Sequence, residues 1–369
     1  MSFREEKNLR VMSNTKRFDW FLFGVVGVLL SFGLVALISA STVISLEKYS
    51  SPYFFVTRQL GIGIGIGLLG LVFFSFIPYG WLKKLAWPFF VLALGINSLL
   101  IFSKFALTSG GAQRWLSFGP IVFQPSEILK LAFIILLAAL LAKRANFFAF
   151  LLLTFLVGIV VMLQPDLGTF TLLVLVGIAV FFASGASWKH IGFTFGLGAL
   201  GIVGLIGIAP YRLNRLLTYL RPEVDPTGAG YQIKQALLAF GSGGLFGLGL
   251  GASRQKYSYL PATINDSIFA IIGEEFGFVG VLVVVGLFLL FAWLGLRIAM
   301  RAKDQFGKLL AVGITSWIVI QALINMMGIS NLLPLTGIPL PFISYGSSAM
   351  IASLAGVGIL LSISKEGKG

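Results

Sequence analysis

The chain has 369 residues, of which 57% are hydrophobic and only 11% are charged. A soluble domain carries about a quarter charged residues, so this composition excludes an ordinary water-soluble enzyme and indicates a protein whose solvent is mostly the bilayer. The lack of cysteine excludes disulfides, thiol catalysis and cysteine-based zinc sites, and a single histidine, His190, excludes a site with several histidine ligands.

Ten apolar segments recur along the chain at lengths suited to crossing a membrane. The first of them resembles a signal peptide, but its apolar run is longer than a signal sequence needs, so we interpret it as a retained span. The predicted spans are 20–42, 55–77, 85–103, 127–142, 147–163, 169–184, 191–209, 267–296, 307–327 and 345–363.

The basic residues set the orientation. The net charge of +14 comes from Lys and Arg that stand in ones and twos between apolar segments, so we expect no nucleic-acid partner. Placing the N-terminus inside gives the cytoplasmic side more than half of the 27 Lys and Arg residues, as the positive-inside rule requires. With an even number of spans, both termini are then cytoplasmic.

The predicted fold class is therefore an all-α polytopic membrane protein of about ten transmembrane helices. A cytoplasmic tail covers 1–19, one membrane domain covers 20–364, and a second tail covers 365–369. Two polar segments face outside, 104–126 and the long extracytoplasmic loop 210–266. Long loops on a rigid scaffold often carry function.

Five of the 13 carboxylates stand at or inside predicted helix ends. A carboxylate near hydrocarbon is costly and normally faces a cavity or a cation, so each is a candidate functional residue. Asp266, before the eighth span, is either a helix N-cap or a base beside an outer cavity, and the two roles are compatible. Asp166 is first a predicted N-cap. Helical spacing lets Glu274 share the Asp266 cavity, whereas Glu275 points to another helix.

A cationic cluster lies in the first outer segment. Glu127 and Lys130 are three residues apart and share a helix face, with Arg114 nearby in sequence. One interpretation is a local ion pair at the membrane surface. The other is a cationic seat for an anionic headgroup, with Arg114 as a bidentate fork and Lys130 as a point charge.

Three glycine runs have no nucleotide-binding context. The run 61–67 lies within an apolar span, where glycines suit close helix packing. The runs 241–244 and 247–251 lack the Lys-Ser/Thr of a phosphate-binding loop and are predicted to lie outside the cell.

Short sequence blocks follow one another along the whole chain: GGAQRW at 110–115, QPSEILK at 124–130, QPDLGT at 164–169, DP at 225–226, GYQ at 230–232, GSGG at 241–244, LP at 260–261, DSIFA at 266–270, GEE at 273–275, LP at 333–334 and TGIPLPFISYG at 336–346. In these blocks the chain resembles the SEDS family (shape, elongation, division and sporulation), which includes FtsW and RodA. The pair 255–256 is closer to the FtsW branch, and Ala262 and Ser267 depart from the usual family residues.

This resemblance implies a peptidoglycan glycosyltransferase in the bacterial cytoplasmic membrane, which polymerises lipid II at the outer face. The implied reaction inverts the anomeric carbon and expels undecaprenyl pyrophosphate from a lipid-linked glycan chain. The implied partners are a class B penicillin-binding protein, other membrane proteins of the division or elongation machinery, and membrane lipid. The alternatives are a lipid II flippase and a non-catalytic division scaffold.

On this basis Asp266 is the expected base, or the ligand of a divalent cation such as Mg²⁺ or Mn²⁺ that helps the diphosphate to leave. Arg114 and Lys130 are expected to hold the diphosphate, with Glu127 orienting Lys130. Glu274 and Asp166 are expected to position these groups without contacting the substrate themselves.

Overall fold

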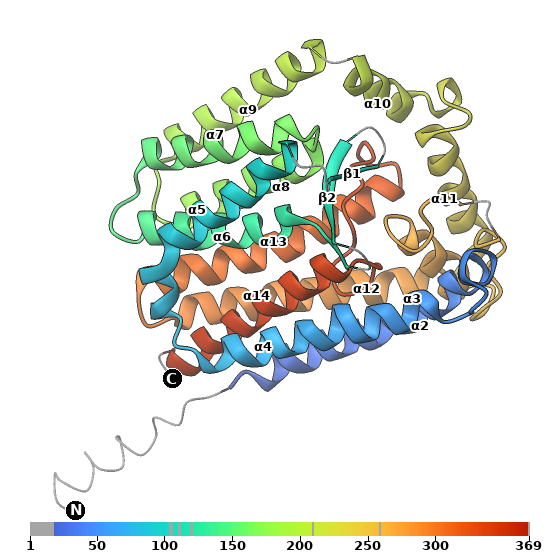
Figure 1. Ribbon diagram of the computed structural model, residues 1–369, viewed down its shortest axis with the longest axis horizontal. Coiled ribbons are helices and arrows are strands. Elements are labelled where there is room, and N and C mark those ends of the chain that lie inside the picture. Colours follow the sequence, from blue (N-terminus) through green and yellow to red (C-terminus); the bar gives the residue numbers. More distant parts are fainter. Residues whose placement is uncertain are drawn as a thin grey trace, which may run out of the picture.

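The computed structural model describes residues 18–102, 106–109, 112–118, 121–208, 210–257 and 260–367. The predicted N-terminal tail therefore lies outside the described residues up to residue 17, as do residues 368–369 of the C-terminal tail. Long helices run side by side along one axis of the molecule (Figure 1).

Each of the predicted spans falls on a helix, so the polytopic helical fold is confirmed. The second span is continuous but changes from an α-helix through a π-helix, η1, to a second α-helix. The helices of the spans are α2 (Trp20–Tyr49), α3 (Phe54–Arg58) with η1 (Gln59–Gly65) and α4 (Ile66–Phe76), α5 (Gly80–Phe102), α6 (Pro125–Leu141), α7 (Phe147–Leu163), α8 (Leu167–Ala183), α9 (Trp188–Ile208), α12 (Ile268–Arg301), α13 (Gln305–Ile329) and α14 (Ser347–Glu366). Among the described residues, 6 helices are long and apolar enough to cross a membrane, and α7 and α8 are shorter apolar helices.

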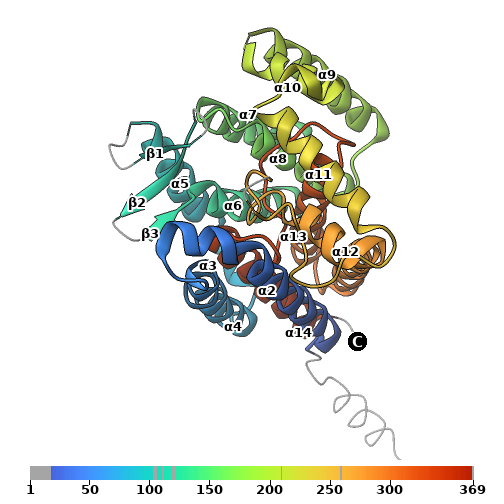
Figure 2. The same cartoon turned by 90° about the vertical axis from the view of Figure 1, so that its right-hand side faces the viewer.

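The centre of the bundle is formed by α6, α13 and α14. Nearly every side chain of α6 is buried, and so are most side chains of α14 and α13. The outer helices α2, α4 and α5 instead expose rows of large apolar side chains. Seen along the helices, α6 and α13 lie inside a ring of other elements (Figure 2).

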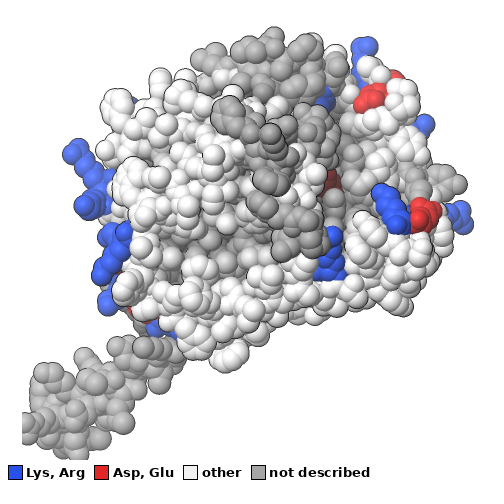
Figure 3. Space-filling view, viewed as in Figure 1, with Lys and Arg blue, Asp and Glu red and all other residues white. Residues whose placement is uncertain are grey.

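Charged residues are distributed as a membrane requires. Lys and Arg gather at the end of the molecule where the C-terminus lies, and a broad band without charge separates that end from the other (Figure 3). On α2, Trp20 and Tyr49 are exposed at opposite helix ends. Their separation, about 43 Å at 1.5 Å per residue, matches the ~40–45 Å of a bilayer with its headgroups. Aromatic residues are typical of both interfaces.

The two outer segments differ from the loops that the sequence predicted. Part of 104–126 forms an antiparallel sheet in the order β1 (Ala106–Ser109), β2 (Ala112–Phe118) and β3 (Ile121–Phe123). The segment 210–266 contains the helices α10 (Pro210–Leu220) and α11 (Ala229–Gly243) and the 3-10 turn η2 (Pro222–Val224). About half of this segment is helical, and it forms a cap over that end of the bundle.

The helix α12 is interrupted at Gly277, whose φ of 67° is left-handed. The glycine-rich turn after α11 fills the break: Leu248 N–H donates to the Glu274 carbonyl (3.0 Å), and Phe278 N–H donates to the Gly244 carbonyl (2.9 Å). A Cβ on Gly247 would lie only 2.1 Å from the Glu275 carbonyl oxygen. Gly247 therefore permits a close backbone approach, which explains this glycine without a ligand.

The segment between α13 and α14 folds back into the bundle. Ser344 Oγ donates to the Asn265 carbonyl (2.6 Å), and Tyr345 N–H donates to the Ile264 carbonyl (2.9 Å). Gln59, buried in η1, donates to the Ser344 carbonyl (3.4 Å). The first two bonds join the segment to the turn that precedes α12, and the third joins it to η1.

Candidate functional site

Asp266 lies in the turn just before α12, with its backbone carbonyl anchored by α13. Its carbonyl accepts a bond from Asn325 Nδ2 of α13 (3.0 Å), and the same amide nitrogen donates to the Ile338 carbonyl (2.8 Å). A Cβ on Gly337 would stand 3.5 Å from Asp266 Oδ2. Asn325 thus holds the Asp266 turn against the segment 336–340.

The predicted N-cap role of Asp266 is wrong. The residue at the N-cap of α12 is Ser267, without a side-chain cap bond, because the helix begins only at Ile268. Within the described residues, no group donates a hydrogen bond to the Asp266 carboxylate. The backbone is held, and the carboxylate is left available for another partner.

Burial raises the pKa of the Asp266 carboxyl to about 6, against the opposing positive charges of Arg114 and Arg215. The side chain is half-buried, so a substrate can reach it. A carboxylate whose pKa lies just below neutral pH is ionised and also a stronger base than an ordinary aspartate.

Arg114 reaches this site from β2. Its guanidinium donates to the Pro165 carbonyl and lies 3.8 Å from Asp166 Oδ1. Among the described residues its Nε has no hydrogen-bond partner, and 20% of the side chain is exposed. Arg114 is therefore fixed on one edge, while part of its side chain stays exposed.

The predicted N-cap role of Asp166 is confirmed. Its Oδ1 accepts the N–H of Thr169 (3.2 Å) in the first turn of α8, and its Oδ2 accepts the Thr169 hydroxyl (2.8 Å). The start of α8 packs on the segment near Asp266, since a Cβ on Gly168 would lie 2.9 Å from the Thr336 carbonyl oxygen. Asp166 thus caps a helix and also holds Arg114.

Lys130 and Glu127 form the predicted pair, with Nζ 2.8 Å from Oε1. The lysine is only 1% exposed: its ammonium also donates to Gln321 Oε1 (2.9 Å) and lies 5.2 Å above the Trp317 ring centre. Gln321 in turn donates to the Pro339 carbonyl (3.0 Å). The pair therefore lies under the segment 336–340, and its contacts do not reach Asp266 directly.

Glu274 and Glu275 bond to residues away from the Asp266 carboxylate. Glu274 accepts bonds from Ser253 Oγ (2.5 Å) and the Arg254 N–H (2.9 Å), and Glu275 accepts the hydroxyl of Ser39 (2.6 Å). The structure thus joins Glu274 to the segment 253–256 rather than to the Asp266 carboxylate. Glu275 bonds to another helix, as its spacing predicted.

Sequence reasoning did not identify Gln321, Asn325 or Arg215. A signal existed for the first two, because a Gln and an Asn four residues apart in an apolar span lie on one helix face. Arg215 carried no such signal, since it belonged to a segment interpreted as a loop.

The chain is similar to known proteins over nearly its whole length. The family model for FtsW, RodA and SpoVE, described as "Cell cycle protein", matches residues 19–369. Stage V sporulation protein E of Bacillus subtilis (strain 168) is 40% identical over 355 residues, covering 94% of this chain and 97% of that protein. A protein of Geobacter sp. (strain M18) named "Probable peptidoglycan glycosyltransferase FtsW" is 37% identical, covering 97% of this chain and 100% of its own.

Solved structures show the same fold. A chain of a peptidoglycan synthase complex, described for its coordination of polymerization and crosslinking, matches with a TM-score of 0.76 at 26% identity, over 94% of this chain and 97% of that one. Rod shape determining protein RodA of Thermus thermophilus matches with a TM-score of 0.69 at 28% identity, over 94% and 96% of the two chains.

Proposed function

Because this chain belongs to the FtsW, RodA and SpoVE family of cell cycle proteins, we propose that it is a peptidoglycan glycosyltransferase that polymerises lipid II. It acts at the outer face of the bacterial cytoplasmic membrane and releases undecaprenyl pyrophosphate. The names of the FtsW relatives support the enzyme class.

The observation that carries this proposal is the environment of Asp266. Its backbone is anchored by Asn325, its carboxylate accepts no bond from the described residues, and its pKa is raised to about 6. A sugar hydroxyl is a weak acid, so it needs a base within about 3 Å as it attacks the anomeric carbon. Asp266 takes that proton, the new glycosidic bond forms with inversion, and the diphosphate leaves with the electrons of the broken C–O bond.

The leaving diphosphate needs positive charge more than it needs an acid. Arg114 supplies this charge directly, since its guanidinium is held by Pro165 and Asp166 and part of its side chain is exposed. Lys130 adds a buried positive charge, oriented by Glu127 and tied through Gln321 to the segment beside the site. Contact between Lys130 and the diphosphate requires this network to open.

A divalent cation is an alternative partner for Asp266. In the described part of the chain, no group of three or more carboxylates or histidines gathers as a ready metal site. Mg²⁺ is commonly held by one or two carboxylates together with substrate phosphates, so Asp266 fits a cation that arrives with the diphosphate. Bound there, Mg²⁺ or Mn²⁺ would supply charge neutralisation to the leaving group.

We propose a class B penicillin-binding protein as the partner that crosslinks the product. The similarity to a chain of a complex that couples polymerization to crosslinking supports this assignment. Activity is therefore best measured on the assembled complex.

The test is gel-resolved polymerisation of labelled lipid II by the purified complex, with moenomycin present to silence contaminating glycosyltransferases. Asp266→Asn removes the base and keeps the side-chain shape. Asp304→Asn is the matched control, because Asp304 caps α13 at the other end of the bundle and asparagine caps equally well. We expect polymer from wild type and Asp304→Asn only.

Other outcomes have defined meanings. Equal polymer from Asp266→Asn would show that Asp266 is not the base. Lipid II translocation without any polymer from the wild-type complex would indicate a flippase. The absence of both activities would indicate a scaffold.

A further inference from the structure

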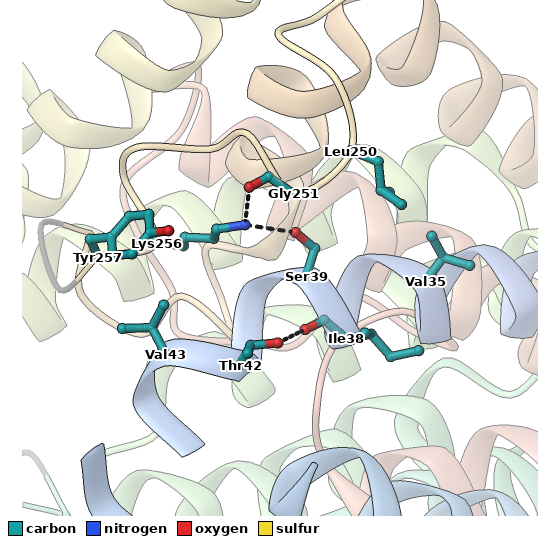
Figure 4. A pocket seen from close by; sticks show the side chains of 9 residues that line it. All are labelled: Val35, Ile38, Ser39, Thr42, Val43, Leu250, Gly251, Lys256 and Tyr257. Atoms are coloured by element: carbon teal, nitrogen blue, oxygen red, sulfur yellow. Dashed lines mark hydrogen bonds between the residues drawn. The ribbon is translucent and has the colours of Figure 1, made fainter. Parts of the chain in front are cut away.

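A groove of about 410 Å³ lies between α2 and the segment 250–257, away from the Asp266 site. One wall comes from the face of α2 that carries Val35, Ser39 and Val43, and the other from Leu250 and Tyr257 (Figure 4). Its volume falls within the ~300–1,000 Å³ of small-molecule sites.

The groove lies at hydrocarbon depth. Val43 and Val35 are about 9 and 21 Å below Tyr49 along α2, at 1.5 Å per residue, and Tyr49 is exposed at the interfacial end of this helix. Tyr257, 57% exposed, stands at the same end of the groove as Val43 (Figure 4). The medium that faces the groove is therefore the outer half of the bilayer core.

The polar groups in the groove are already satisfied by the protein. The Lys256 ammonium has three N–H donors, and it bonds to the Gly251 carbonyl (2.6 Å), Ser39 Oγ (3.2 Å) and Glu275 Oε1 (3.3 Å). The Thr42 hydroxyl donates to the Ile38 carbonyl of its own helix (2.6 Å). The groove thus contains a cation that is neutralised within the fold and presents mainly apolar atoms.

These observations distinguish between occupants. An anionic headgroup finds no unpaired donor on Lys256. A partner transmembrane helix is normally held by small residues and by Ser or Thr hydrogen bonds across the interface, but the Ser39 and Thr42 hydroxyls are bonded within this chain. A hydrocarbon chain needs neither.

We propose that this groove binds one acyl chain of an outer-leaflet phospholipid. The chain runs along α2 from Val43 to Val35 and packs against Leu250 on the opposite wall. A bound acyl chain therefore packs on the segment 250–257, which precedes the turn of Asp266 in the sequence. Binding itself is independent of the proposed glycosyltransferase activity and is measured without it.

The test uses the purified chain in nanodiscs that contain phosphatidylglycerol with a diazirine midway along one acyl chain. After photolysis, mass spectrometry locates the adducts. We expect them to concentrate on 35–43 and 250–257, and to fall at least fivefold in Val35→Trp, which fills the groove. Leu250→Trp, which fills it from the other wall, should have the same effect.

The matched control is Val28→Trp, which places the same side chain two helical turns away on the same exposed face of α2, outside the groove. Adducts spread evenly over lipid-facing helices, or unchanged in Val35→Trp, would overturn the proposal. So would stronger labelling by a polyisoprenyl phosphate probe than by the acyl probe. Loss of the adducts when a partner membrane protein is reconstituted alongside would assign the groove to a helix instead.

Discussion

The exact start of α12 decides what Asp266 does. Asp166 directly precedes its helix and caps it, whereas Asp266 is followed by Ser267 before the first residue of α12. The turn is tightened by Ala262, which has a φ of 51° and whose carbonyl accepts the Ser267 N–H. A sequence pattern locates such a boundary only to within a few residues, so the carboxylate was predictable as a candidate and its freedom from capping was not.

At the same scale, we expect polymerisation to depend on ionisation of Asp266. Its raised pKa of about 6 means that the base is lost as pH falls through 6, so the rate should fall about tenfold per pH unit below that value and level off above pH 7. Initial rates of lipid II polymerisation from pH 5 to 8 measure this. A rate that stays constant from pH 5 to 8 would contradict a base with a raised pKa of about 6.

Ionisation of Asp266, which polymerisation is expected to require, should lower the stability of the folded protein. A raised carboxyl pKa means that the folded protein binds the proton more tightly than the unfolded chain, so ionised Asp266 destabilises the fold above pH 6. We expect Asp266→Asn to leave the Tm at pH 7.5 unchanged or to raise it. A clear drop in Tm would mean that the carboxylate makes stabilising bonds in the folded protein.

The Lys130–Glu127 pair should behave differently, because both side chains are almost fully buried. Lys130→Met leaves Glu127 without its cation and should cost about 3–5 kcal/mol of stability, as breaking a buried pair does. Glu127→Gln with Lys130→Met removes both charges and should restore most of the Tm but not polymerisation. Full activity in the double variant would exclude any electrostatic role of Lys130. Thermal unfolding of the purified proteins measures the changes in stability, and lipid II polymerisation measures activity.

At the scale of elements, hydropathy predicted the spans and missed what lies between them. The helix α10 carries Leu213, Leu217 and Leu220 at helical spacing, but it is too short and polar to register as a span. The strands β1 to β3 are short and pair antiparallel with their neighbours in the chain, and no long apolar run marks them in the sequence. Neither α10 nor the strands have the length of a membrane span, so a search for long apolar segments passes over both.

The break in α12 gives a prediction at this scale. Gly247 has a φ of 82°, and a Cβ there would meet the Glu275 carbonyl oxygen at 2.1 Å, so Gly247→Ala must displace the turn that fills the break. Gly241 has open space around its Cβ position and is the matched control. We expect Gly247→Ala to lose about 1–3 kcal/mol or more and Gly241→Ala to lose none. Thermal unfolding compares them, and equal Tm values would mean that the turn moves freely.

At the scale of the whole molecule, the contacts that assemble the site join distant parts of the chain. Asn325 reaches Asp266 across 59 positions, and Lys130 reaches Gln321 across 191. Single-sequence patterns report short-range spacing, so they predicted the Glu127–Lys130 pair and not its link to Gln321. Helix-end position and spacing supplied the candidates, and the resemblance to a family supplied their expected roles. The folded chain shows which of them meet: Arg114 and Asp166 meet near Asp266, while Lys130 and Glu274 take other partners.

The orientation in the membrane remains a prediction that the cysteine-free chain allows one to test cleanly, because any introduced cysteine is the only thiol. Glu223 and Lys143 are both exposed, Glu223 in the cap that carries α10 and α11 and Lys143 after α6 at the basic end. If the basic end is cytoplasmic, a membrane-impermeant maleimide should label Glu223→Cys in intact cells and Lys143→Cys only after permeabilisation. The reverse pattern would place Asp266 on the cytoplasmic side, where polymer could not reach the cell wall, and would contradict the proposed function as well as the topology.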